Sequence, residues 1–108
     1  MLEMVVRTFQ FFLNDQNGDL VTFLETEAWT LEVEVMSGPG GLGSNGIDIC
    51  TFQTNGFCDI SFSLDISADG YALQLIVKNS NGTVVDTIAP YDIESVNVGP
   101  RPLHIILK

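Results

Sequence analysis

The alternation of apolar and polar residues over 29–35 most constrains what this chain can fold into. In the segment Trp-Thr-Leu-Glu-Val-Glu-Val, every odd position is apolar and every even position is polar. Successive side chains of a β-strand point to opposite faces, so the pattern predicts a strand with one face in a core and the other in water. The same period returns over 58–66 and 71–77.

Turn-forming pairs separate these segments. Asn-Gly occurs at 17–18, 45–46, 55–56 and 81–82, and Asp69-Gly70 adds a fifth turn. These residues supply the positive φ angles of tight hairpins. Nine strands are predicted, over 4–13, 19–24, 28–36, 47–52, 57–66, 70–78, 83–88, 92–98 and 103–107. In a chain of 108 residues without a helical stripe, this indicates an all-β, immunoglobulin-like β-sandwich of about 7–9 antiparallel strands.

Proline and glycine mark the boundaries near the end of the chain. Pro90 is expected to break the chain, and the sandwich is predicted to cover residues 4–98. Residues 99–108 read as a linker, Gly99-Pro100-Arg101-Pro102, followed by a terminal strand. That strand either completes this domain's sheet or begins a following repeat.

The net charge of −10 excludes one class of partner. Nucleic-acid binding requires clustered cations that displace phosphate counterions, and the chain holds four Lys and Arg against fourteen Asp and Glu. The same charge disfavours anionic membranes, and no apolar run is long enough to span a bilayer. The first residues lack the stages of a secretory signal. A protein partner or a neighbouring repeat is expected, with no nucleic acid, no direct membrane insertion and no cofactor.

Three short motifs resemble tandem immunoglobulin-like repeats. They are the turn at 15–21 (D-Q-N-G-D-L-V), the strand at 55–62 (N-G-F-C-D-I-S-F) and the strand at 69–73 (D-G-Y-A-L). Similar motifs occur in filamin-type repeats, in bacterial immunoglobulin-like adhesin repeats and in fibrocystin-like animal surface proteins. The resemblance implies a non-catalytic sandwich that serves as a spacer, an adhesion unit or a docking module, and it carries no catalytic residues across.

Cys50 and Cys58 flank the Asn55-Gly56 turn. A five-residue turn centred on Thr54 would place them opposite each other on paired strands, within disulfide reach. The alternative is two buried thiols packed as small hydrophobic side chains. A disulfide requires an oxidising compartment, which favours an extracellular or cell-surface location. The short spacing argues against the inter-sheet disulfide of antibody domains.

Three further surface features are candidate sites. Asn81-Gly82-Thr83 is an N-glycosylation acceptor triplet on a predicted hairpin tip. Asp15 and Asp19 flank a turn that resembles a calcium loop, although the end positions of that loop are leucines and a plain hairpin turn is preferred. The loop at 37–46 is either a flexible connection or a binding loop, with these residues as its candidates: Ser37, Gly38, Leu42, Ser44 and Asn45.

Catalysis is not expected. His104 is the only histidine, and its place in an alternating strand predicts that it faces solvent. Two pairs of glutamates, at 25 and 27 and at 32 and 34, suit the polar face of a strand.

Two alternatives to an extracellular spacer stay open. One is a carbohydrate-binding module, which would need exposed aromatic residues such as Phe11, Phe23, Phe52 or Phe57. The other is a cytoplasmic filamin-like scaffold that binds peptides by strand addition.

Overall fold

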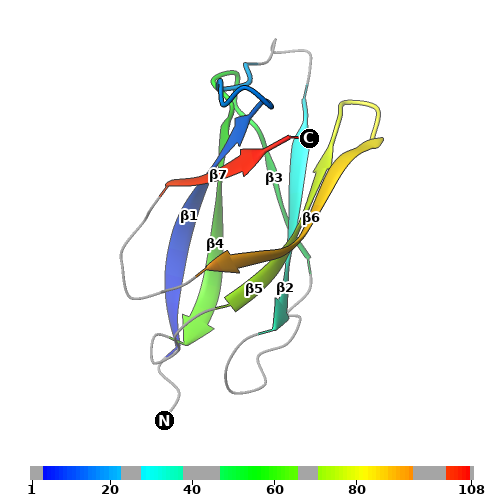
Figure 1. The fold of residues 1–108 in the computed structure, drawn as a ribbon. Helices are drawn as coiled ribbons and strands as arrows, with labels where there is room; N and C mark the ends of the chain where they lie inside the picture. The colour runs from blue at the N-terminus through cyan, green and yellow to red at the C-terminus, as the bar shows by residue number, and fades with distance from the viewer. Residues whose placement is uncertain (1–3, 23–27, 38–46, 66–70, 94–101, 108) are drawn as a thin grey trace.

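Seven strands make up the regular structure of the chain (Figure 1). The computed structural model describes residues 4–22, 28–37, 47–65, 71–93 and 102–107, and the side chains of most of them. The strands are β1 (Met4–Asn14), β2 (Thr30–Ser37), β3 (Ile47–Thr51), β4 (Phe57–Asp65), β5 (Tyr71–Lys78), β6 (Val84–Ile93) and β7 (Pro102–Ile106). Within the described ranges every regular element is a strand, which confirms the all-β prediction.

The strands form two sheets. One has three strands in the order β4-β1-β7, and the other has four in the order β3-β2-β5-β6. In Figure 1 the three-stranded sheet lies toward the left, and β2, β5 and β6 lie toward the right. The ladder between β1 and β4 is the longest in the smaller sheet, running antiparallel from Met4 opposite Asp65 to Phe12 opposite Phe57.

Both sheets turn their alternate apolar side chains toward one core. Where the side chains of β1, β2 and β5 are described, every second residue is buried, as a strand period of two predicts. The nine largest fully buried side chains come from β1, β2, β5 and β7 of the two sheets: Phe9, Phe11, Leu13, Leu31, Val33, Leu73, Leu75, Val77 and Ile105. Removal of this apolar surface from water is the main force that holds the two sheets together.

The terminal strand completes the smaller sheet. β7 pairs with β1 from Gln10 opposite Pro102 to Asn14 opposite Ile106, and it buries Leu103 and Ile105 in the core. The pairing is parallel, so the expectation of antiparallel strands throughout is wrong for this pair.

Three hairpin turns have the same backbone geometry. In the turns 15–19, 53–57 and 79–83, the first residue donates its N–H to the carbonyl of the fifth and accepts the N–H of the glycine in fourth place. Gly18, Gly56 and Gly82 have φ angles of 85°, 85° and 81°, and no described residue other than glycine has a positive φ. The motif is a type I turn followed by a left-handed glycine, one of the common three-residue hairpin loops. The Asn-Gly turns predicted at these three places are confirmed.

Two strand predictions are wrong. Separate strands are predicted over 83–88 and 92–98 with a break at Pro90, but β6 runs through Pro90 as one edge strand, and residues 94–98 lie outside the described residues. The register of β5 against β6 shifts between Leu73 and Leu75, and Pro90 lies at this irregularity. Proline has no N–H to donate, and at this position the ladder does not require one. The described part of the predicted strand 19–24 forms only an isolated bridge between Leu20 and Asn14. The turns predicted at 45–46 and 69–70 and the linker at 99–101 lie outside the described residues.

The buried turn gives the first prediction. Gly18, Gly56 and Gly82 share one φ, so an alanine strains the backbone equally at each. A Cβ at Gly56 would also overlap the backbone oxygen of Val21 and crowd Leu20, whereas Gly18 and Gly82 face open space. We expect Gly56→Ala to lower the free energy of unfolding by roughly 3 kcal/mol or more, and the other two substitutions by roughly 1–2 kcal/mol. Urea unfolding measures the three values, and equal losses would contradict the close approach.

Candidate functional site

A disulfide bridge closes one corner of the molecule. Cys50 of β3 and Cys58 of β4 are bonded, with their Cα atoms 5.9 Å apart. The predicted bond is therefore present, but the geometry expected for it is wrong. β3 pairs with β2 and β4 pairs with β1, so the two cysteines lie on edge strands of different sheets rather than on one ladder.

The 53–57 turn carries the chain from one sheet to the other at this corner. The Phe52 N–H donates to the Trp29 carbonyl in the larger sheet, at 2.9 Å, and the Leu13 N–H donates to the Gly56 carbonyl, at 2.8 Å. Phe52 and Cys58 are buried there. The disulfide thus joins the two sheets despite its short spacing, so the expectation that this spacing argues against an inter-sheet disulfide is wrong.

The calcium candidate is a turn held by its own side chain. Asp15 Oδ1 accepts the backbone N–H groups of Asn17 and Asp19, at 2.9 and 3.0 Å. These bonds stabilise the loop with no need of an ion. Among the described residues, no three His, Cys, Asp or Glu side chains come together as metal ligands.

The glycosylation candidate lies at the exposed tip of the hairpin between β5 and β6. Asn81, Gly82 and Thr83 are all exposed, as the sequence predicts. Of the five binding-loop candidates, Ser37 alone is among the described residues. Ser37 ends β2, and Gly38, Leu42, Ser44 and Asn45 lie outside the described residues.

His104 is exposed, as predicted, and its side chain links β7 to β1. Its ring stacks on Phe12, with centroids 5.4 Å apart and planes 24° apart. Its Nδ1 lies 2.8 Å from Asn14 Oδ1, and because an amide oxygen only accepts, Nδ1–H is the donor. Asn14 Nδ2 in turn donates to the Gly18 carbonyl. Asn14 is the one buried polar residue among those described, and sequence reasoning missed this role because its partner lies 90 positions away.

A row of rings crosses the outer face of the smaller sheet. Phe57, Phe12 and His104 lie opposite one another on β4, β1 and β7. The centroids of Phe12 and Phe57 are 5.9 Å apart. The Phe12 ring thus contacts both of its neighbours in the row. Of the other aromatic candidates, Phe11 and Phe52 are buried and Phe23 lies outside the described residues.

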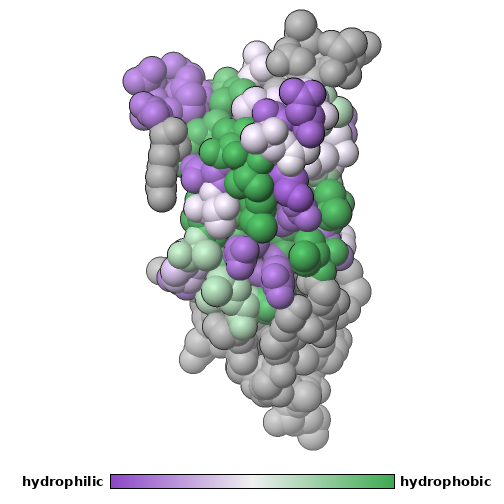
Figure 2. All heavy atoms as spheres, turned by 90° about the vertical axis from the view of Figure 1, so that its right-hand side faces the viewer, coloured by the Kyte–Doolittle hydropathy of each residue, from purple (hydrophilic) through white to green (hydrophobic). Residues whose placement is uncertain are grey.

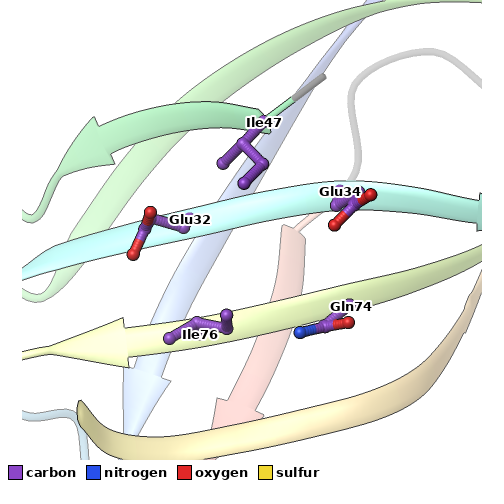
Figure 3. Close-up of a pocket in the computed structure, with 5 residues that line it drawn as sticks. All are labelled: Glu32, Glu34, Ile47, Gln74 and Ile76. Atoms are coloured by element: carbon purple, nitrogen blue, oxygen red, sulfur yellow. The ribbon is translucent and has the colours of Figure 1, made fainter. Parts of the chain in front are cut away.

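The outer face of the larger sheet is partly apolar. Across β3, β2, β5 and β6 one row reads Ile49, Glu32, Ile76 and Thr87. Glu32 forms an ion pair with Lys78 at 2.5 Å. Five residues line a shallow hollow on this face (Figure 3): Glu32, Glu34, Ile47, Gln74 and Ile76. Glu32 and Glu34 project side by side from β2, as strand alternation predicts, and Glu25 and Glu27 lie outside the described residues.

The edge of this sheet at β3 is the most exposed apolar strand described. Ile47 and Ile49 are 54% and 62% exposed. In an antiparallel ladder, residue pairs that exchange hydrogen bonds alternate with pairs that do not. The bond from the Phe52 N–H to the Trp29 carbonyl makes 29 and 52 a bonded pair, so the β3 residues 47, 49 and 51 belong to non-bonded pairs with β2. The backbone groups of Ile47, Ile49 and Thr51 therefore point away from β2. Figure 2 views the molecule from the right-hand side of Figure 1, and the side that it shows carries hydrophobic and hydrophilic residues intermixed.

Comparison with known proteins adds no family. No protein-family model matches the chain, and neither does any curated protein or solved structure. Among the described residues, no helix is long and apolar enough to cross a membrane.

The Asn14–His104 contact gives the second prediction. We expect His104→Ala to lower the free energy of unfolding by about 1–3 kcal/mol, because it removes a stacked ring and leaves the buried Asn14 oxygen unpaired. Ile106 lies on the same exposed face of β7, and Ile106→Thr serves as the control, with a change within about 0.5 kcal/mol. Thermal or urea unfolding measures both, and a His104→Ala loss no larger than the control would refute the linking role.

Proposed function

We propose that this chain is a non-catalytic, immunoglobulin-like sandwich module of an extracellular or cell-surface protein, where it serves as a spacer or protein-binding unit. The observation that carries the proposal is the disulfide between the two sheets. Disulfides persist in oxidising compartments and are rare in the cytosol. The Cys50–Cys58 bond also stabilises the corner where the chain changes sheets.

The packing of the chain supports a structural role. Side chains from both sheets fill one core, and the molecule is elongated, with principal extents of 45 × 23 × 22 Å. Two of the residues considered for catalysis have structural contacts. Glu32 pairs with Lys78, and His104 bonds to Asn14. Neither pairing provides a nucleophile with an adjacent base.

The disulfide is tested by its redox state and by its contribution to stability. In chain produced through a secretory pathway, we expect no thiol alkylation until a reductant is added, as measured by intact mass. The double substitution of Cys50 and Cys58 by Ser is expected to lower the free energy of unfolding by about 2–3 kcal/mol, the loop-closure value for so short a loop. Two thiols that alkylate readily without reductant would sink the extracellular assignment.

The edge at β3 favours a second candidate, a scaffold that binds peptides by strand addition. The backbone N–H and C=O groups of Ile47, Ile49 and Thr51 point outward, and an extended peptide pairs with such an edge through main-chain bonds. Glu34 and Asp48 lie beside the two isoleucines on this edge and its neighbour β2. The peptide would therefore carry alternating apolar and basic residues.

A synthetic peptide of alternating Val and Lys tests this second candidate. We expect Ile49→Asp to weaken binding by about tenfold or more, because it removes an apolar contact and adds desolvated charge. Val84→Asp, on the opposite edge strand β6, adds the same charge and is expected to leave binding unchanged. Fluorescence anisotropy at physiological salt measures both, and an equal effect of the two substitutions would show non-specific attraction rather than pairing at β3.

A further inference from the structure

The tip of the β5–β6 hairpin is a turn that does not use the side chain of its central asparagine. Asn79 holds the turn: its Oδ1 accepts the N–H groups of Asn81 and Thr83, at 3.0 and 3.1 Å, and its carbonyl accepts the Gly82 N–H. Thr83 contributes its backbone to the turn. The side-chain amide of Asn81 and the hydroxyl of Thr83 are therefore free to serve another purpose without cost to the fold.

The three equivalent turns of this chain differ at this point. All have Asn-Gly at the third and fourth places, but the fifth residue is Asp19 in the first, Phe57 in the second and Thr83 in the third. Only the third therefore completes the triplet Asn-X-Ser/Thr that oligosaccharide transferases accept. Its residues 80–85 are all exposed, whereas Gly56 in the second turn is buried.

We propose that Asn81 is an N-glycosylation site, an inference that rests on the proposed extracellular function. The reactant is an oligosaccharide linked to a lipid through pyrophosphate. The Asn81 Nδ2 attacks the first sugar carbon, the bond from that carbon to the pyrophosphate oxygen breaks, and the amide loses one proton. The lipid pyrophosphate leaves, and a neutral amide bearing the oligosaccharide remains.

The position of this glycan gives it a structural effect. Val84 and Val85, which follow the triplet at the start of β6, are 52% and 41% exposed. β6 is an edge strand, and an exposed apolar edge invites pairing with other chains. A hydrated oligosaccharide on Asn81 stands next to this end of β6 and hinders such pairing. The edge at β3, on the far side of the same sheet, would remain accessible.

The test uses the whole chain secreted from a eukaryotic cell, with intact mass measured before and after enzymatic glycan removal. We expect the wild-type chain to carry one glycan mass that removal eliminates while converting Asn81 to aspartate. Asn81→Gln and Thr83→Ala are expected to lose that mass completely. Thr83→Ser keeps the hydroxyl and is expected to retain it. Asp19→Thr completes the triplet in the equivalent exposed turn, and we expect it to add a second glycan.

The redox state of the cysteines, read in the same spectra, separates the two proposals. A disulfide-bonded wild-type chain without a glycan overturns the assignment of Asn81 and leaves the extracellular function standing, whether or not Asp19→Thr is modified. A glycan that persists in Asn81→Gln overturns the assignment as well. Free thiols together with a bare Asn81 overturn both proposals.

Discussion

The pairing of β1 with two partners is the constraint on which the rest of the structure depends. β1 is the central strand of the smaller sheet and supplies three of the most buried side chains: Phe9, Phe11 and Leu13. Because those residues face the core, the opposite face of β1 is fixed outward, and it carries Phe12 between Phe57 and His104. Asn14 at its end bonds to the first turn and to β7. The core contacts, the row of rings and the pairing with β7 therefore all depend on the register of β1.

The corner between β3 and β4 has a different origin. A hairpin sequence normally keeps its two strands in one sheet, and here the same five-residue turn sends them into different sheets. The close approach of Gly56 to Val21 and the Cys50–Cys58 bond hold the turn against the neighbouring segment. As a result β3 is an edge strand of the larger sheet, and among the described strands only β2 pairs with it. The other side of β3 is the edge at which a peptide would add as a further strand.

The sequence predicted local features well and non-local ones poorly. Alternation fixes which residues face the core, since a period of two leaves no choice of face, and glycine marks the positive φ of each turn. Strand partners depend on energies spread over the whole core, so the sheet change after Cys50 and the parallel pairing of β7 had no local signal. Pro90 was misread because its effect depends on whether the strand is central or at an edge. The disulfide was predicted from spacing alone, and its inter-sheet geometry was not.

The parallel pairing of β1 and β7 has a mechanical consequence. Tension applied through the segment before β1 and the segment after β7 pulls the two strands in opposite directions along their length. The hydrogen bonds between them then carry the load together, in shear, instead of opening one after another as in a hairpin pulled from its open end. His104 and Asn14 lie within this loaded pair. A module connected in series in this way resists extension at the same ladder that completes its smaller sheet.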